Sequence, residues 1–251
     1  MPDTLVVIPA RYSSTRFPGK PLAKIAGRSM ILRVCDQIKC CKQISDFIVA
    51  TDDERIVEEV QSNGYPVMMT AADHQSGTDR IAEIAASRNE SWILNIQGDE
   101  PFLDPKMIDE FLIDFHAQAS ECLVGTIACP INSLDEYEDP NVVKVVLRNN
   151  QQALYFSRSQ IPHDRDRLNN FKHLYRHLGV YLYNRDTLLG FSNLPVSDLE
   201  QIEKLEQLRL LQAGYDMYVH LVDEASFGID TPEDLENAEY YFQQAKNKGS
   251  K

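Results

Sequence analysis

Short, continuous apolar runs alternate with amphipathic helical patterns along the first half of the chain, and this alternation restricts the fold more than any other feature. The runs are rich in β-branched residues, which is typical of strands buried on both faces of a parallel sheet. They lie at residues 5–8, 47–50, 67–69, 92–96 and 123–128, and the first is expected to stop at Pro9. Between them, helical spacing predicts helices around residues 30–38, 56–60, 81–85 and 107–115. The pattern predicts an α/β fold, with a mostly parallel sheet and helices on both faces.

The pattern changes after about residue 140. Residues 142–147 and 153–156 are predicted strands, and residues 177–183 alternate as an antiparallel strand does. We therefore expect a smaller antiparallel or mixed extension of the sheet. A single helix is predicted over residues 199–211, ended by Ala213-Gly214, and Thr231-Pro232 is typical of the start of a C-terminal helix.

Composition and charge exclude several classes of partner. The 251 residues include 38 acidic and 25 basic side chains, a formal net charge of −13, so we expect no nucleic acid and no membrane as partner. Five cysteines without C-x-x-C spacing predict neither a disulfide framework nor a zinc site, and indicate a reducing compartment. No apolar run is long enough for a signal peptide or a membrane span, which favours a cytoplasmic location.

The segment after the first strand, residues 9–21, gathers basic and hydroxyl side chains in an otherwise acidic chain. Ligands of open α/β sheets bind beyond the carboxyl ends of the strands, where this segment is expected. Arg11 and Arg16 can form forked contacts with phosphate, and Lys20 can form a point contact. We interpret the segment as a triphosphate-binding loop, and the alternative is a solvated basic loop. It matches neither the Walker pattern nor G-x-G-x-x-G.

Two aspartates follow apolar segments in positions suited to metal binding. Asp99 lies in a tight turn after the predicted strand at 92–96, and Asp230 lies just before the C-terminal helix. Mg²⁺ prefers one or two carboxylates together with phosphate oxygens. Taken alone, Asp99 could be a turn residue and Asp230 a helix cap. Together with the basic loop, they indicate metal-assisted phosphoryl or nucleotidyl transfer.

Residues 73–80 place an amide, two hydroxyls and a glycine before a predicted helix. Such groups can hydrogen-bond to the edge of a base, and glycine lets the backbone approach a ring closely. The alternative is that Ser76 or Thr78 is simply the N-cap of the helix. His74 has no cysteine or acid pattern for a metal nearby, so we interpret it as a surface or structural residue.

Nine segments resemble the CMP-Kdo synthetase family, the 3-deoxy-manno-octulosonate (Kdo) cytidylyltransferases. They are residues 8–22 (IPARYSSTRFPGKPL), 50–53, 73–80, 97–101 (QGDEP), 141–146, 153–158, 176–181, 199–209 and 230–235 (DTPEDL). They occur in order over nearly the whole chain. The resemblance implies an α/β fold of the nucleotide-diphospho-sugar-transferase type, and transfer of CMP from CTP to the anomeric hydroxyl of Kdo. Pyrophosphate is released, and the activated sugar serves lipopolysaccharide synthesis.

The same resemblance implies CTP and Kdo as substrates, Mg²⁺ as cofactor and a homodimer. It implies a single cytidylyltransferase domain over residues 1–251, in which the parts have different roles. Residues 1–140, approximately, would be the nucleotide-binding half. Residues 141–230, approximately, would be the sugar-binding and dimerisation extension, and residues 231–251 the C-terminal helix.

Site residues are carried over by position from this resemblance. The nucleotide-binding residues are Ala10, Arg11, Ser13, Ser14, Arg16, Lys20, Gln75, Ser76, Gly77 and Thr78. The sugar-binding residues are Gln97, Arg158, His177, Tyr181, Glu206 and Gln207. Asp99 and Asp230 would bind Mg²⁺, and with Arg11 and Lys20 they would form the catalytic set.

The chemistry of the sugar-site residues agrees with this assignment, because Arg158 can meet a carboxylate and the others can bind hydroxyls. Alternatively, His177 and Tyr181 belong to a core or an interface, and Glu206 pairs with Arg209. One departure is visible: Ser29 in Gly27-Arg-Ser-Met30 stands where the family commonly has a proline that stiffens the entry to the first helix.

Three other functions remain open from the sequence. The chain could be a cytidylyltransferase for another acid sugar, such as 8-amino-Kdo or a sialic acid. It could be a glycosyltransferase of related fold, which would release no pyrophosphate. It could also be a catalytically silent nucleotide-binding protein.

Overall fold

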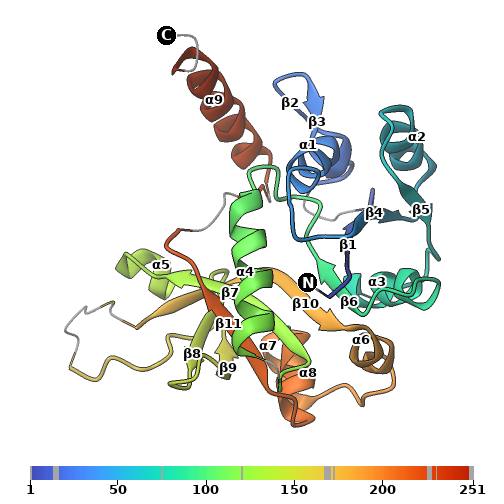
Figure 1. Cartoon of the computed structure of the whole chain (residues 1–251). Helices are drawn as coiled ribbons and strands as arrows, with labels where there is room; N and C mark the ends of the chain where they lie inside the picture. The colour runs from blue at the N-terminus through green and yellow to red at the C-terminus, as the bar shows by residue number, and fades with distance from the viewer. Residues whose placement is uncertain are drawn as a thin grey trace. The chain divides into compact units, whose positions relative to one another are not determined.

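The computed structural model describes residues 2–13, 17–74, 76–119, 121–166, 171, 173–224, 228–229 and 231–248, and for residues 241 and 243–248 only the backbone. The chain divides into two compact units. The first unit comprises Pro2–Asp109 and Ser226–Lys251, and the second comprises Glu110–Ala225. Figure 1 shows the elements of both.

The first unit contains four parallel strands in the order β6-β1-β4-β5. Their bounds are Thr4–Ala10 (β1), Asp46–Thr51 (β4), Val67–Met69 (β5) and Trp92–Asn95 (β6). The helices are α1 (Met30–Ile38), α2 (Glu54–Ser62), α3 (Gly77–Ala86) and α9 (Pro232–Lys248). A hairpin is formed by β2 (Lys24–Ile25) and β3 (Arg28–Ser29). The central strand β1 is almost fully buried, as its apolar run predicted.

The first strand does not stop at Pro9, which corrects the prediction from the sequence, but continues to Ala10. The Val7 carbonyl accepts a hydrogen bond from the Ile96 N–H (3.3 Å). Backbone groups alternate between the two edges of a strand, so Pro9 faces the same edge as Val7. The neighbouring strand β6 ends at Asn95, opposite Val7, so it offers no strand acceptor opposite Pro9. Proline therefore breaks no hydrogen bond between the two strands by lacking an N–H.

The second unit contains a mixed set of strands. They are β7 (Val124–Pro130), β8 (Lys144–Leu147), β9 (Ala153–Ser157), β10 (Tyr175–Asn184) and β11 (Met217–Leu221). Strand β7 pairs with β11 in parallel and with β10 antiparallel, and the pairs β10–β8 and β8–β9 are antiparallel. The predicted fold class, a mostly parallel mixed sheet with a smaller antiparallel extension, is therefore confirmed.

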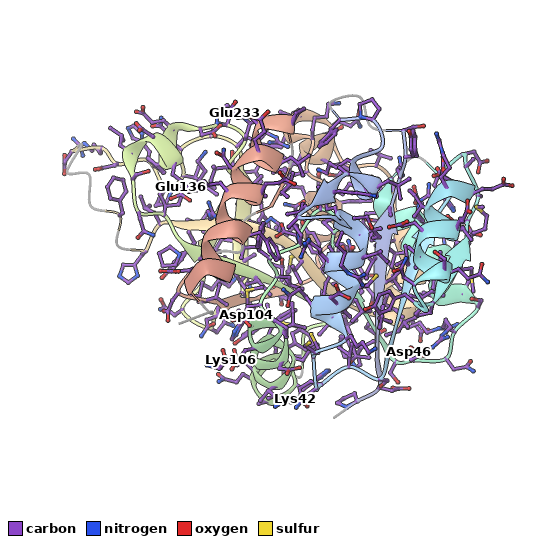
Figure 2. The ribbon with its side chains drawn as sticks, turned by 90° about the horizontal axis from the view of Figure 1, so that it is seen from above. Lys42, Asp46, Asp104, Lys106, Glu136 and Glu233 are labelled. Atoms are coloured by element: carbon purple, nitrogen blue, oxygen red, sulfur yellow. The ribbon has the colours of Figure 1, made fainter. Side chains whose placement is uncertain are left out.

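Helices pack against these strands. They are α5 (Leu134–Glu138), α6 (Arg185–Phe191), α7 (Asp198–Glu203) and α8 (Gln207–Gln212), and α4 (Pro105–Gln118) connects the two units along the chain. Phe111 and Phe115 of α4 lie so close to Gly125 of β7 that a Cβ there would stand 2.6 Å from the Phe115 ring. Glu136 of α5, labelled in Figure 2, pairs with Arg176 of β10 (2.8 Å).

The single helix predicted over residues 199–211 is two helices, which corrects the second prediction. Ser197 and Glu200 form a capping box that starts α7, and Lys204 then adopts a left-handed conformation (φ 56°) that ends it. Leu205 is buried in the break, and α8 begins at Gln207. Periodicity alone did not reveal the break, because a left-handed lysine has no sequence signal.

The predicted C-terminal helix is confirmed. It begins at Pro232, and Thr231 and Asp234 exchange hydrogen bonds across its first turn (2.8 and 3.2 Å). All five cysteines are free thiols. Among the described residues, none of the helices has the length and apolar character needed to span a membrane.

Replacing Ser29 with proline is expected to raise the free energy of unfolding by about 1 kcal/mol. Ser29 precedes α1 at the position of the departure from the family pattern, and its φ of −62° already suits proline. Its hydroxyl is buried with no hydrogen-bond partner in the described part of the chain. The proline removes that hydroxyl and restricts the unfolded chain. Urea denaturation measures the change, and an unchanged or lower stability would contradict the account.

Candidate functional site

The loop after β1 is closed by contacts at its two ends. The Gly19 N–H donates to the Tyr12 carbonyl (2.9 Å). Gly19 has a φ of 72°, and a Cβ there would lie 3.2 Å from the Tyr12 ring, so glycine suits this position. The Arg55 guanidinium stacks over the Tyr12 ring, 3.2 Å from its centroid. Of the predicted loop residues, Ser14 and Arg16 lie outside the described residues, and Ser13 is exposed.

Lys20 and Asp99 form an ion pair, with Nζ 2.5 Å from Oδ2. Lys20 opens a short 3₁₀ helix (Lys20–Leu22), and Asp99 lies in the turn after β6. A Cβ at Gly98 would lie 3.0 Å from the Pro9 carbonyl oxygen, so glycine permits this turn to approach the end of β1. The two side chains are 13% and 30% exposed, so both remain reachable by a ligand. The fold thus joins two predicted catalytic residues that are 79 positions apart.

Arg11, in the loop after β1, has a hydrogen-bond donor without an acceptor among the described residues. Its Nη2 atom is buried and has no hydrogen-bond partner within the described structure. A buried donor without an acceptor costs about 1–3 kcal/mol, and more when it is charged. A bound anion would remove this cost. Ala10, the last residue of β1, is buried directly before it.

The segment before Asp230 is fastened to the Asp99 turn. The Ile229 N–H donates to the Asp99 carbonyl (3.0 Å), and a Cβ at Gly228 would lie 3.1 Å from a Glu100 carboxylate oxygen. Asp230 itself lies outside the described residues. No cluster of three or more metal-binding side chains occurs in the part of the chain that the structure describes. A site of two carboxylates completed by phosphate oxygens fits Mg²⁺, which seldom uses an all-protein cage.

The segment before α3 has a structural role in addition to its predicted one. Ser76 is the N-cap of α3: its oxygen accepts from the Asp79 N–H (3.1 Å), and its own N–H donates to the Asp79 carboxylate (3.2 Å). The contacts of Ser76 are therefore those of a helix N-cap, which was the alternative to a nucleotide-binding role. Gly77 faces open space and Thr78 is buried, whereas Gln75 lies outside the described residues. His74 pairs with Glu83 at 2.5 Å, as expected of a structural residue.

Arg80 is a residue that the sequence reasoning missed. It is fully buried, and its guanidinium donates to the Asp52 carboxylate (2.7 Å) and to the Thr70 hydroxyl. These partners directly follow β4 and β5, so Arg80 ties α3 to the carboxyl ends of two strands. The available signal was that Asp52 and Arg80 both lie in segments carrying the family resemblance.

The second unit carries His177 and Tyr181 on β10, with ring centroids 5.2 Å apart. The Thr126 hydroxyl donates to the Val180 carbonyl (2.7 Å), so its oxygen accepts from His177 Nε2 (2.8 Å). This network assigns the proton to Nε2 and leaves Nδ1 as an acceptor. Burial, Tyr183 and Glu206 raise the pKa of Tyr181 well above its ordinary value, so its hydroxyl keeps its proton.

Burial lowers the pKa of His177 from 6.5 to about 3, so the folded protein holds this ring neutral. Below pH 6.5 the unfolded chain binds a proton that the folded chain does not, so stability falls as the pH falls toward 3. We expect the free energy of unfolding to drop by about 1–2 kcal/mol more between pH 7 and pH 5 than in His177→Gln. Urea denaturation of both proteins at pH 7 and pH 5 measures this difference. An equal drop in the free energy of unfolding of the two proteins would contradict the account.

Arg158 lies at the end of β9 and is held by main-chain acceptors. Its Nε donates to the Glu203 carbonyl (2.8 Å) and its Nη1 to the Pro140 carbonyl (3.0 Å). Gln207 is 5% exposed, and its Nε2 has no hydrogen-bond partner among the described atoms. A bound polar group would satisfy a buried donor of this kind.

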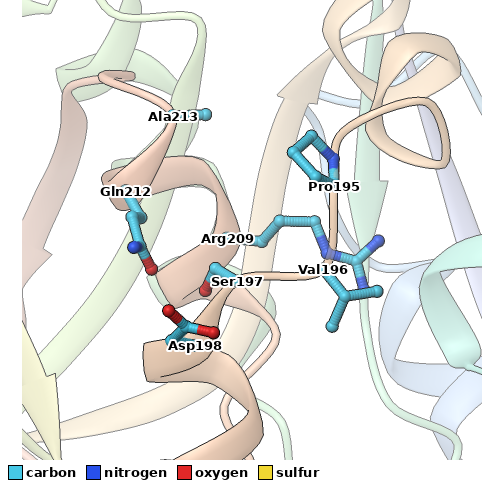
Figure 3. Close-up of a pocket in the computed structure, with 7 residues that line it drawn as sticks. All are labelled: Pro195, Val196, Ser197, Asp198, Arg209, Gln212 and Ala213. Carbon is cyan, nitrogen blue, oxygen red and sulfur yellow. The ribbon is translucent and has the colours of Figure 1, made fainter.

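The predicted sugar-site residues thus fall on both units. Gln97 belongs to the first unit, and Arg158, His177, Tyr181, Glu206 and Gln207 belong to the second. A cavity of about 190 Å³ in the second unit is lined by 195–198, Arg209, Gln212 and Ala213 (Figure 3). A hollow of about 430 Å³ is lined by Glu110, Ile113, Asp114, Gln151 and 220–222. Neither contains a predicted site residue, so the sequence-predicted site is distinct from both.

Comparisons with known proteins show what the chain is similar to. The cytidylyltransferase family model matches residues 5–220. A 3-deoxy-manno-octulosonate cytidylyltransferase from Syntrophotalea carbinolica is 48% identical over 240 residues, 93% of this chain and 96% of the relative. One from Solibacter usitatus is 48% identical over 238 residues, 95% and 94% of the two chains. A solved CMP:2-keto-3-deoxy-manno-octonic acid synthetase, complexed with CTP, is 40% identical with a TM-score of 0.90, covering 97% of this chain and 99% of its own.

Proposed function

Because the chain belongs to the 3-deoxy-manno-octulosonate cytidylyltransferase family, we propose that it transfers CMP from CTP to Kdo and releases pyrophosphate. It is a nucleotidyltransferase. The observation that carries the proposal is the Lys20–Asp99 pair, which joins the segments that follow β1 and β6. A cation for phosphate and a carboxylate for a metal stand there together, and the Arg11 donor without a partner adds a second contact for an anion.

In the proposed reaction, the anomeric oxygen of Kdo attacks the α-phosphorus of CTP. The bond from that phosphorus to the bridging oxygen breaks, pyrophosphate leaves, and the hydroxyl proton passes to solvent. Lys20, Arg11 and Arg16 neutralise the charge that builds on the departing pyrophosphate. Ser13 and Ser14 would hydrogen-bond to the triphosphate. Positioning and charge neutralisation are sufficient chemistry for such a transfer.

Asp99 and Asp230 are proposed to hold Mg²⁺, which when bound supplies a positive charge against the phosphates. Support comes from the Ile229–Asp99 hydrogen bond, because it fastens the residue before Asp230 to the Asp99 turn. Asp99 is paired with Lys20. The triphosphate offers Lys20 a new acceptor, which releases the Asp99 carboxylate for its other role.

The base and the sugar would be bound by separate residue sets. Gln75, Ser76, Gly77 and Thr78 would face the cytosine. Arg158 would pair with the Kdo carboxylate, while Gln97, His177, Tyr181, Glu206 and Gln207 would bind its hydroxyls. Support comes from the His177 Nδ1 acceptor, the protonated Tyr181 hydroxyl and the Gln207 donor.

The wider setting is also proposed. The protein would act in the cytoplasm, in lipopolysaccharide biosynthesis, as a homodimer formed by the extension at about residues 141–230. Leu154 and Ile202 in that stretch are 55% and 78% exposed, and a partner surface would remove part of this apolar exposure. The molar mass measured by light scattering tests the dimer, and a value for one chain would contradict it.

Pyrophosphate release tests the activity. The assay contains Mg²⁺, CTP and Kdo, with ATP, UTP and GTP replacing CTP in parallel, and 8-amino-Kdo and a sialic acid replacing Kdo. Release confined to CTP with Kdo is expected. Release only with another acid sugar would overturn the sugar assignment. CTP binding without release would favour a silent binder, and consumption of a nucleotide sugar without pyrophosphate would favour a glycosyltransferase.

A further inference from the structure

Three oxygen atoms of Glu203 accept hydrogen bonds from Ser157, the last residue of β9, and from Arg158, which follows it. Glu203 is the last residue of α7, and the left-handed Lys204 turns the chain away after it. Carbonyls in the last turn of a helix have no partner within the helix. The Glu203 carbonyl accepts a hydrogen bond from a residue outside the helix, Arg158, whose Nε lies at 2.8 Å. The break that the sequence did not predict therefore presents an acceptor to a proposed substrate-binding arginine.

The Glu203 carboxylate holds the same stretch. Oε1 accepts from the Ser157 hydroxyl (2.5 Å), and Oε2 accepts from the Arg158 backbone N–H (2.9 Å). Ser157 is only 2% exposed, so water competes poorly for these bonds. Glu203 thus contacts both the backbone and the side chain of Arg158, although it lies 45 positions away in the sequence.

Lys144 holds the opposite side of the Arg158 backbone. It is fully buried, and its Nζ donates to the carbonyls of Arg158 (3.0 Å), Asp139 (2.6 Å) and Val142 (2.8 Å). All three of its donors are therefore used on main-chain oxygens. Burial lowers the pKa of Lys144, and the negative charges of Asp139 and Glu203 oppose that shift, so Glu203 helps to keep the ammonium charged.

The remaining edge of Arg158 is available to a ligand. Nε and Nη1 are occupied, and no described residue accepts a hydrogen bond from Nη2. A guanidinium held in one orientation loses little conformational entropy when it binds a carboxylate. The same junction also starts α8, where Glu206 and Gln207 lie.

We propose that Glu203 is a positioning residue: it orients Arg158 toward the carboxylate of the acid-sugar substrate and sets the α7–α8 junction beside it. The inference rests on the proposed function, because it assigns the sugar carboxylate to Arg158. Glu203 itself touches no substrate. Its effect should therefore appear in recognition of the acid sugar and be absent from recognition of CTP.

Kinetics of Glu203→Gln, which preserves size and removes the charge, test the proposal. The KM for Kdo is expected to rise about tenfold or more, with the KM for CTP within about twofold of the parent value. Glu203→Asp should recover part of the loss, because it restores the charge. Ser157→Ala, which removes one partner of the carboxylate, should raise the KM for Kdo by less. It also serves if Glu203→Gln fails to fold.

A double-mutant cycle separates positioning from general support. In the Arg158→Ala background, Glu203→Gln should change kcat/KM for Kdo by less than about twofold, because the residue through which it acts is absent. Glu200→Gln is the matched control: it lies on the same helix and pairs with Arg209 at 2.6 Å. That variant should lower the melting temperature without selectively raising the KM for Kdo.

Failure of the inference can be distinguished from failure of the proposed function. If the parent protein turns over CTP with Kdo but Glu203→Gln leaves the KM for Kdo within twofold, or raises both KM values equally, the positioning role is wrong. Calorimetric binding of Kdo gives a readout without turnover. If the parent binds Kdo without turning it over, weaker Kdo binding by Glu203→Gln would support the positioning role and not the proposed activity. If the parent binds no Kdo, both the positioning role and the proposed function are wrong.

Discussion

Asp99→Asn is expected to lower kcat for pyrophosphate release by about 10³ while the protein remains folded. The substitution keeps the shape of the side chain but removes the charge through which it would hold Mg²⁺. Loss of a metal contact at developing phosphate charge costs several kcal/mol, and each 1.36 kcal/mol is tenfold in rate. The expected loss is therefore in turnover and in the dependence of rate on Mg²⁺ concentration.

The fold should tolerate Asp99→Asn because the ion pair with Lys20 is partly exposed, and pairs of this kind contribute about 0–1 kcal/mol. The Asp99 carbonyl, which accepts from Ile229, is unchanged by the substitution. Asp104→Asn is the matched control, since Asp104 (labelled in Figure 2) is exposed and its carboxylate accepts from the Lys106 N–H in the first turn of α4. Asparagine can make the same cap. Near-normal turnover in Asp99→Asn would refute its assigned role.

Lys20→Met is expected to lower kcat/KM for CTP by about 10²–10³, which is the usual cost of removing one preorganised donor from developing negative charge. Methionine keeps the unbranched length of the side chain and removes the ammonium. The Asp99 carboxylate is 30% exposed, so water can solvate it after its partner is lost. Initial rates over a range of CTP concentrations, together with the melting temperature, measure the effect.

Lys24→Met is the control for this substitution, because Lys24 lies on β2, four residues away, and its side chain is exposed. It should retain the parent rate. Lys20→Arg should restore part of the activity, since the charge returns but the forked guanidinium does not match a point contact. Equal losses in Lys20→Met and Lys24→Met would show that general surface charge, rather than a contact at Lys20, supports turnover.

Several features of the fold were predictable because their causes are local. The apolar run at residues 5–8 became a buried strand, since burial on both faces requires continuous apolar side chains. The run at residues 67–69 did not, because β5 is the edge strand of the sheet, and its Met69 is 45% exposed. The C-terminal helix begins where Thr231 and Pro232 predicted, because a cap and its proline act within one turn. The basic loop was also visible, since its charge contrasts with the rest of the chain.

Local patterns were less informative about where one helix ends and the next begins. Ser76 caps α3, as the alternative from the sequence proposed, and its contact with the base stays a prediction. The apolar spacing at residues 199–211 predicted one helix, but Lys204 interrupts it. A left-handed residue other than glycine is imposed by surrounding packing, here the burial of Leu205, so the local sequence does not predict it.

The positions of the apolar strands, the cap of the C-terminal helix and the inventory of charged groups could be inferred from the chain alone, because they depend on residues a few positions apart. The pairings that make a site could not. Lys20 meets Asp99 across 79 positions and Glu203 meets Arg158 across 45, through backbone approaches such as Gly98 against Pro9. Such contacts depend on strand register and on where the helices end, and these are settled only when the whole core packs.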